Sequence, residues 1–349
     1  MFKPLHKAVI LVGGEGTRLR PLTNSVPKPM LPVLNRPFLE HTIHYLKKYG
    51  ITEIILALSY LPGAIKGYFG DGRAFGVRLH YTIEDSPLGT AGAVKKSEKY
   101  LDSTFAVLNG DIYTDLDMAA MLAFHRHKKA TATIALTWVD NPCAFGVVET
   151  DGNGKVRQFI EKPAPDKVTT NWINAGVYLL EPEVLGQVPA KTPYMFERGL
   201  FPRLLELGKN MCGYQFRSRW LDMGTAEKYL CLNCDLLVSG DKPDFMDMPG
   251  EDGLYCAEGA TIDPSAQING PAIVASRSRI GRQVRLIGPV VIGADCTIGD
   301  GAVLEEAVLW QGVTIGAGAV LRKCIVGNDT EIQPGERVID CVVPPRGTD

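Results

Sequence analysis

The chain has 349 residues, of which 45% are hydrophobic and 22% are charged, and its formal net charge is −2. This length predicts about two domains, and the lack of a basic excess excludes a general affinity for nucleic acid. The first apolar run, residues 8–12, is too short for a signal peptide or a membrane span. We therefore expect a cytoplasmic protein that does not bind membranes.

Apolar runs alternate with helical patterns up to about residue 238. The patterns predict strands at 7–12, 53–58, 78–83, 104–111, 131–139 and 172–182, a hairpin over 145–163 that turns at 151–154, and helices at 36–50 and 89–101. Such alternation is typical of a Rossmann-like α/β fold, in which helices flank a mixed, mostly parallel sheet.

The first predicted strand runs into a glycine-rich loop, LVGGEGTRLRPLT, at residues 11–23. The loop fits neither Walker A nor the dinucleotide fingerprint, whose third glycine position is Leu19 here. Glycines at 13, 14 and 16 would let the backbone approach a triphosphate closely.

Two cations accompany this loop. Arg18 can bind phosphate oxygens in a bidentate manner, and Lys28 adds a point charge on a proline-stiffened segment. The structural alternative is that the loop arginines are solvent-exposed charges, and for Arg20 the two readings stay equally open.

Two aspartates far apart in the sequence are candidate metal ligands. Asp111 follows a buried strand, where an α/β sheet presents its ligand crevice, and Asp222 precedes a Gly-Thr pair that begins a helix. Two carboxylates together with phosphate oxygens are what Mg²⁺ prefers. Either aspartate alone could instead cap a helix.

Other possible metal ligands have simpler interpretations. Cys231 and Cys234 form a C-x-x-C, but no second pair follows at zinc spacing, and residues 226–240 indicate a helix that buries them. His125 and His127 would point apart on a helix, so we expect both to be exposed near its end. We expect all eight cysteines to be free.

The pattern changes after a predicted linker at residues 239–255. From 256 to 349, aliphatic residues recur every six positions, with the phase slipping by one residue twice: Ile262, Ile268, Val274, Ile280, Leu286, Ile292, Ile298, Leu304, then Leu309, Ile315, Leu321, then Val326, Ile332, Val338. A hexapeptide repeat predicts a left-handed parallel β-helix of roughly four turns.

Seven stretches of this chain together resemble the sugar-1-phosphate nucleotidyltransferases, or NDP-sugar pyrophosphorylases. They read, in order, LVGGEGTRLRPLT, PKPMLPV, EDSPLGTAGAV, LNGD, FGVV followed by FIEKP, INAGVYLL and WLDMGT. The resemblance implies a catalytic domain over 1–238, in which a sugar 1-phosphate attacks the α-phosphorus of an NTP and pyrophosphate leaves.

The resemblance also implies roles for individual residues. Catalysis would involve Arg18, Lys28, Asp111 and Asp222, the two aspartates holding Mg²⁺; nucleotide binding would involve Leu11, Gly13, Gly14, Gly16, Thr17, Glu84 and Gly89; the sugar phosphate would contact Gly146, Glu161, Lys162 and Asn174. The structural alternative for Glu161 and Lys162 is a surface pair beside a turn.

Glu84 bears on the choice of base. Family members that use thymidine or uridine triphosphates usually carry Gln at the matching position, whereas a carboxylate pairs with the two adjacent donors of guanine. Glu84 therefore favours GTP. The string PLGTAG and the 349-residue length with a β-helix tail are also similar to the members that make GDP-mannose from GTP and mannose 1-phosphate. The sequence MGTAEKY after Asp222 departs from many of these members, and members specific for other sugars carry Gly-Thr at that point.

Several alternatives remain. A glucose-1-phosphate thymidylyl- or uridylyltransferase, a heptose-1-phosphate guanylyltransferase and a non-catalytic nucleotide-sugar-binding regulatory subunit each fit part of the pattern. A β-helix acyltransferase is disfavoured because all six histidines precede residue 128. We expect a homo-oligomer, assembled through the β-helix.

Overall fold

The computed structural model describes residues 5–84, 86–239 and 253–347. Contacts divide the chain into two compact units. The sheet unit contains residues 1–14 and 42–222, and the β-helix unit contains residues 15–41 and 223–349. The predicted linker at 239–255 lies mostly outside the described residues.

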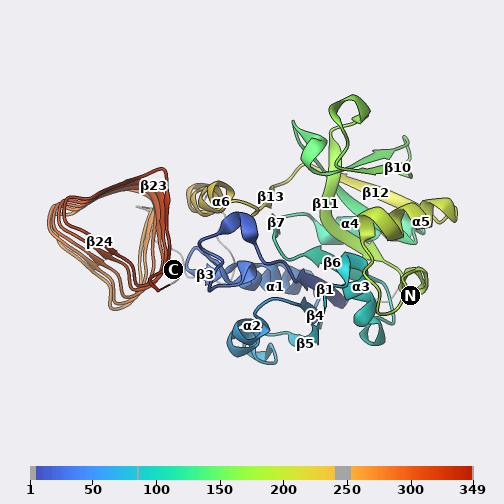
Figure 1. Ribbon diagram of the computed structural model, residues 1–349, viewed down its shortest axis with the longest axis horizontal. Coiled ribbons are helices and arrows are strands. Elements are labelled where there is room, and N and C mark those ends of the chain that lie inside the picture. Colours follow the sequence, from blue (N-terminus) through green and yellow to red (C-terminus); the bar gives the residue numbers. More distant parts are fainter. Residues whose placement is uncertain (1–4, 85, 240–252, 348–349) are drawn as a thin grey trace. The chain divides into compact units, whose positions relative to one another are not determined.

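The sheet unit is built on one nine-stranded mixed sheet (Figure 1). Its strands are β1 (Lys7–Val12), β4 (Glu53–Leu58), β5 (Arg78–Ile83), β6 (Phe105–Asn109), β8 (Ala132–Trp138), β9 (Gly146–Thr150), β10 (Val156–Glu161), β11 (Trp172–Leu180) and β12 (Met211–Phe216). The order is β10-β9-β11-β6-β1-β4-β5, and β8 joins β11 to β12. The pairs β1–β4, β1–β6 and β4–β5 are parallel, while β11 runs antiparallel to β6 and β8.

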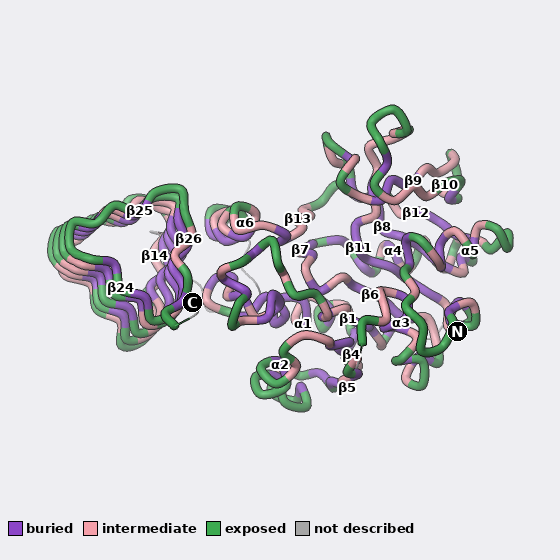
Figure 2. The backbone as a smooth tube through the Cα atoms, in the orientation of Figure 1, coloured by how far each residue is buried: buried purple, intermediate pink, exposed green. Residues whose placement is uncertain are grey.

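Helices and a short second sheet complete this unit. The helices are α1 (Phe38–Lys48), which begins in the β-helix unit, α2 (Pro62–Phe69), α3 (Gly89–Lys96), α4 (Met118–His127) and α5 (Phe201–Glu206), which follows a π-helical turn at Phe196–Leu200. The second sheet pairs β7 (Ile112–Thr114) with β13 (Trp220–Asp222). Figure 2 shows the central strands mostly buried, as expected for a sheet covered on both faces.

Residues that the repeat pattern predicted to be buried do form the core of the β-helix. Its strands are β14 (Leu254–Cys256), β15 (Thr261–Ile262), β16 (Gln267–Asn269), β17 (Ala272–Val274), β18 (Arg279–Ile280), β19 (Arg285–Ile292), β20 (Thr297–Ile298), β21 (Val303–Leu309), β22 (Thr314–Ile315), β23 (Val320–Val326), β24 (Glu331–Ile332), β25 (Arg337–Ile339) and β26 (Val342–Val343). All inter-strand pairs are parallel, and the coils are triangular in cross-section (Figure 1). The aliphatic positions from Val274 to Val338 lie in one buried cluster.

The first phase slip has a local structural cause. Two residues separate Ile287 from Val290 on β19, but only one separates their partners Glu305 and Ala307 on β21. The extra residue belongs to a Gly288–Pro289 corner, so later coils turn the same corner with one residue fewer. The five-stranded sheet of β15, β18, β20, β22 and β24 adds one coil to the four that we expected.

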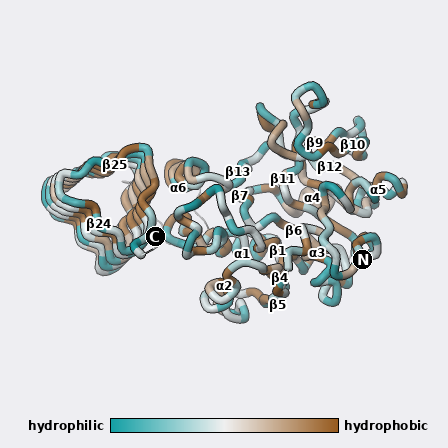
Figure 3. Tube along the Cα trace, viewed as in Figure 1, coloured by the Kyte–Doolittle hydropathy of each residue, from teal (hydrophilic) through white to brown (hydrophobic). Residues whose placement is uncertain are grey.

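The β-helix unit also contains the 14-residue helix α6 (Ala226–Ser239) and the short hairpin of β2 (Pro32–Val33) and β3 (Arg36–Pro37). Helix α6 packs against β19, β21 and β23, the side of the β-helix that is rich in hydrophobic residues in Figure 3. None of the helices in the described residues has the length and hydrophobicity that a membrane span requires.

Two expectations about metal-like residues need correction. His125 is not exposed: its ring is 1% accessible, with Nδ1 2.7 Å from the Thr133 hydroxyl and Nε2 3.1 Å from the Glu181 carboxylate. Cys231 lies on the predicted helix but is exposed, whereas Cys234 is half-buried. Partial burial together with the Asp235 carboxylate raises the pKa of Cys231 to about 11, and burial raises that of Cys234 to about 12, so both thiols are protonated near neutral pH.

Candidate active site

The second half of the glycine loop packs on Lys28 within the β-helix unit. Gly16 adopts φ +66°, and a Cβ atom there would lie 3.0 Å from Thr23 Cγ2 and 3.2 Å from Lys28 Cβ. The Thr23 hydroxyl also donates to the Gly16 carbonyl at 2.8 Å. Gly16 is therefore required both for its backbone angle and for the close approach of the Lys28 segment. The Lys28 side chain is buried, at 7% exposure.

The loop arginines differ in their surroundings. Thr17 and Arg18 are exposed on a single 3₁₀ turn, which the buried Leu19 anchors. Arg20 lies 3.5 Å from the Glu15 carboxylate, and both side chains are more than half exposed. Such a pair contributes little to stability, but it gives Arg20 a partner inside the loop, whereas Arg18 projects into solvent from the turn.

The first half of the loop ends β1 in the sheet unit. The Gly110 N–H donates to the Leu11 carbonyl at 2.9 Å, which ties the end of β6 to the end of β1. The Ser59 hydroxyl donates to the Gly13 carbonyl, and a Cβ atom at Gly13 would lie 2.8 Å from that hydroxyl oxygen. Gly14 is exposed and has open space around it. The carboxyl ends of β1, β4 and β6 thus meet at one edge of the sheet, where Gly14 is exposed.

The structure brings the two aspartates to neighbouring positions. Asp222 ends β13, where it pairs with Ile112, the residue directly after Asp111. Paired residues of antiparallel strands have Cα atoms about 4.5–5.5 Å apart, so Asp222 and Asp111, both half-buried, lie close together along the backbone.

The donor set at this point fits Mg²⁺. Both side chains offer only oxygen donors, and Asn109, two residues before Asp111, has a buried Oδ1 with no hydrogen-bond partner in the described structure. The described residues contain no group of three or more His, Cys, Asp or Glu side chains arranged for a metal. A pair of carboxylates suits an ion that completes its shell with phosphate oxygens and water.

The residues expected to contact a sugar phosphate lie on adjoining strands. Gly146 on β9 is the register partner of Glu161 on β10, and a Cβ atom at Gly146 would lie 2.9 Å from Glu161 Oε2. Lys162 follows directly, exposed and at φ +49°, with its N–H bonded to the Phe145 carbonyl. On β11, Asn174 donates to the Tyr178 hydroxyl at 2.9 Å and accepts from the Gly176 N–H at 2.9 Å.

Glu197 is a further candidate functional-site residue, a buried carboxyl with a shifted pKa, that the sequence analysis missed. It lies in the π-helical turn, is 9% exposed, and accepts a hydrogen bond from the Thr90 hydroxyl at 3.1 Å. Burial, reinforced by the charge of Glu161, raises the pKa of Glu197. Burial likewise raises the pKa of Tyr178, with Glu197, Glu161 and Asp111 adding to the effect.

Glu197→Gln should stabilise the protein near neutral pH. Because the folded state holds the pKa of Glu197 above its unfolded value, the carboxylate destabilises the fold above that pKa, and the penalty disappears as the pH falls through it. We expect a higher Tm for the variant at about pH 7.5 and a smaller difference near the ordinary value of 4.5. Glu206→Gln, an exposed control, should shift Tm little at either pH; equal shifts for both variants would contradict the prediction.

Glu84 follows β5 and closes a short loop. Its Oε2 accepts from the Leu88 N–H at 2.9 Å, so one carboxylate oxygen holds its own loop. Burial raises the pKa of this carboxyl, although the Leu88 hydrogen bond and Lys96 oppose the shift. Gly89 begins α3 at φ +69°, where a Cβ atom would lie 2.8 Å from the Tyr194 carbonyl.

The chain belongs to the nucleotidyl transferase family, whose model matches residues 7–239, and a model of the GMPPB C-terminal domain matches residues 260–345. It is 39% identical over 299 residues to a mannose-1-phosphate guanylyltransferase of Mycobacterium tuberculosis, covering 83% of this chain and 82% of that one. It is 35% identical over 323 residues to a UTP–glucose-1-phosphate uridylyltransferase of Synechocystis, covering 87% of this chain and 83% of that one.

Solved structures agree with this assignment. The fold matches a putative glucose-1-phosphate thymidylyltransferase from Bacillus anthracis, crystallised with sucrose, at TM-score 0.60 and 26% identity, over 65% of this chain and 94% of that one. It also matches HddC from Yersinia pseudotuberculosis in complex with GMP-PN at TM-score 0.57 and 30% identity, over 66% of this chain and 98% of that one. The fold and the family together identify an enzyme of nucleotidyl transfer.

Proposed function

We propose that the protein joins GTP and a sugar 1-phosphate, with mannose 1-phosphate as the preferred sugar, into an NDP-sugar and pyrophosphate. An oxygen of the sugar phosphate attacks the α-phosphorus in line; the new P–O bond forms as the bond to the β-phosphate breaks. The observation that carries the proposal is the strand pairing that places Asp222 beside Asp111, within a chain of this family.

The residues divide the work between binding and charge neutralisation. Arg18 binds the departing pyrophosphate, and Lys28 neutralises charge on the reacting phosphates. Asp111 and Asp222 would hold Mg²⁺, which when bound supplies charge neutralisation at the phosphate oxygens. Positioning and electrostatics supply most of the rate enhancement in such a reaction.

Substrate recognition falls to the remaining predicted residues. The nucleotide is bound by backbone of the glycine loop (Leu11, Gly13, Gly14, Gly16 and Thr17), by Glu84 and by the turn at Gly89. The sugar phosphate is bound by Lys162, and the sugar hydroxyls by Gly146, Glu161 and Asn174. Two observations support the sugar-binding assignment. Gly146 and Glu161 are paired across β9 and β10, and two hydrogen bonds hold the Asn174 side-chain amide in one orientation.

At the level of domains, residues 1–238 catalyse the reaction and residues 256–349 mediate assembly into a homo-oligomer. A matrix of nucleoside triphosphates against sugar 1-phosphates, scored by pyrophosphate release, tests the whole proposal. The fastest turnover with GTP and mannose 1-phosphate is the expected result. If the protein preferred UTP and glucose 1-phosphate, the substrates in the name of the Synechocystis relative, the proposal of GTP and mannose 1-phosphate would be wrong.

Glu84→Gln should change the preference for the base. The amide oxygen of Gln can still accept from the Leu88 N–H, so the loop is retained while the second acceptor for guanine is lost. We expect kcat/KM for GTP to fall by about 10²-fold relative to UTP. If the ratio of kcat/KM for GTP to that for UTP did not change, Glu84 would not recognise the base and would only hold its loop through the Leu88 N–H.

A further inference from the structure

The segment that carries Lys28 has few hydrogen-bond donors of its own. Prolines occupy positions 27, 29 and 32, and none of them has a backbone N–H. Within the segment, the Met30 N–H bonds to the Pro27 carbonyl and the Leu31 N–H to the Lys28 carbonyl. What fixes the segment in place must therefore come mostly from groups outside it.

The hairpin that follows holds a strained turn. Its two turn residues, Leu34 and Asn35, have φ values of +47° and +65°, in the left-handed region that side chains rarely adopt. Leu34 is nevertheless fully buried. Such a conformation persists only where the surroundings hold it.

Helix α6 and the β-helix supply the groups that hold it. The buried Asn233 accepts from the Leu34 N–H at 2.9 Å and donates to the Tyr229 carbonyl at 3.0 Å. From the other side of the turn, Asn35 Nδ2 donates to the Ile292 carbonyl at 3.0 Å.

A second connection runs from the β-helix to Pro32. The indole N–H of Trp310, buried at 2% exposure, donates to the Tyr229 hydroxyl at 2.9 Å. The Tyr229 hydroxyl in turn donates to the Pro32 carbonyl, four residues after Lys28. Because burial raises the pKa of Tyr229, the phenol keeps its proton and remains a donor throughout the working pH range.

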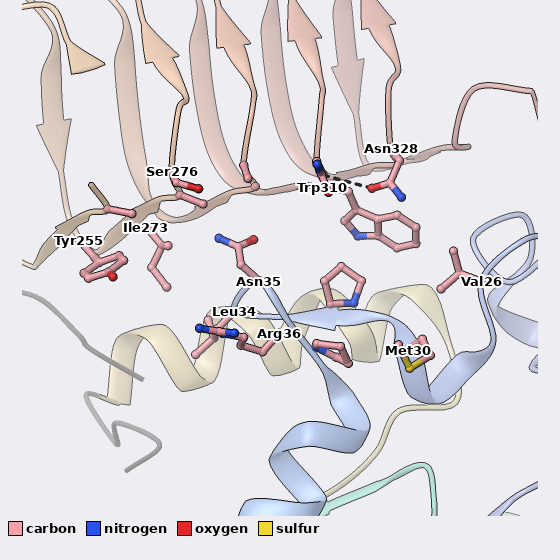
Figure 4. Close-up of a pocket in the computed structure, with 17 residues that line it drawn as sticks. Val26, Met30, Leu34, Asn35, Arg36, Tyr255, Ile273, Ser276, Trp310 and Asn328 are labelled. Carbon is pink, nitrogen blue, oxygen red and sulfur yellow. Dashed lines mark hydrogen bonds between the residues drawn. The ribbon is translucent and has the colours of Figure 1, made fainter. Parts of the chain in front are cut away.

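These bonds matter because packing does not fill the space beside them. A cavity of about 510 Å³ lies between residues 26–37 and the β-helix wall, lined by Leu34 and Asn35 on one side and Trp310 on the other (Figure 4). On that side the segment is joined to the β-helix by a few directed hydrogen bonds and not by continuous side-chain packing.

We propose that Trp310, Tyr229 and Asn233 are positioning residues for the reaction: through Pro32 and Leu34 they fix the segment that presents Lys28. The inference rests on the role proposed above for Lys28. It gives the β-helix a part in catalysis in addition to assembly.

The test uses the full-length protein and steady-state pyrophosphate release. Tyr229→Phe keeps the ring but removes both hydrogen bonds of the hydroxyl, so we expect kcat to fall about tenfold while KM for both substrates stays within about twofold. Trp310→Phe leaves the bond to Pro32 intact, and we expect a loss of about threefold. Ile315→Ala, a cavity variant in the β-helix core on β22, is the control: it should lower Tm and leave kcat unchanged.

A double-mutant cycle decides whether Tyr229 acts through Lys28. In a Lys28→Met background, Tyr229→Phe should cause no further loss of kcat. An equal loss of kcat in both backgrounds would overturn the inference and leave the proposed function standing. So would a wild-type kcat in Tyr229→Phe when Lys28→Met alone strongly lowers kcat. Wild-type kcat in Lys28→Met would overturn the role of Lys28 itself, and the inference with it.

Discussion

Asp111→Asn and Asp222→Asn are each expected to lower kcat by about 10³-fold while the protein stays folded. Each change removes one negative charge and replaces one carboxylate oxygen with an amide nitrogen that cannot coordinate Mg²⁺. The side-chain shape is nearly unchanged, and both positions are half-buried at the pairing of β7 with β13, so we expect the fold to tolerate them. The measurements are pyrophosphate release at saturating Mg²⁺ and thermal unfolding.

Asp117 offers a matched control close in sequence. Its carboxylate caps α4 by accepting from the Ala120 N–H at 3.0 Å, and asparagine caps helices about as well. Asp117→Asn should therefore retain wild-type kcat. If both Asp111→Asn and Asp222→Asn also retained wild-type kcat, these residues would be removed from the proposed metal site.

A metal titration gives a second readout on the same variants. If the carboxylates share one ion, losing either should raise the Mg²⁺ concentration needed for half-maximal activity. Residual activity whose Mg²⁺ dependence matches the wild type would indicate that the aspartates act by orienting substrate and not by holding the metal.

Patterns that depend on neighbouring residues could be predicted well from the sequence. In the β-helix each short strand buries one aliphatic side chain, so Ile280, Ile298 and Ile315 reveal both the repeat and its core. The same holds for the glycine loop, where the crowding of Gly16 against Thr23 explains in physical terms why a glycine was needed.

Features that depend on long-range register could not be predicted. The sequence marked Asp111 and Asp222 as separate candidates, but only the antiparallel pairing of β7 with β13 makes them neighbours. Glu197 carried no local signal, since its burial arises from a π-helical turn and from Thr90, a residue far away in the chain. His125 shows the same limit. Helical spacing could not reveal that its two ring nitrogens form hydrogen bonds with Thr133 and Glu181.

Lys28→Met is expected to lower kcat by about 10³-fold, with a smaller effect on KM. The side chain is buried beside Gly16, where a charge costs more to hold than in water and acts more strongly on a nearby phosphate. A group that neutralises charge developing in the transition state contributes mainly to kcat. Pyrophosphate release at saturating GTP and sugar phosphate measures the effect.

Two comparisons separate this role from a general effect of positive charge. Lys209→Met removes an exposed lysine after α5 and should leave kcat unchanged. Arg18→Met should act differently, because Arg18 is exposed and is assigned to the leaving pyrophosphate. We expect it to change KM for pyrophosphate in the reverse reaction more than it changes kcat. If Lys28→Met also changed mainly that KM, the lysine would belong with Arg18 on the pyrophosphate and not at the reacting phosphorus.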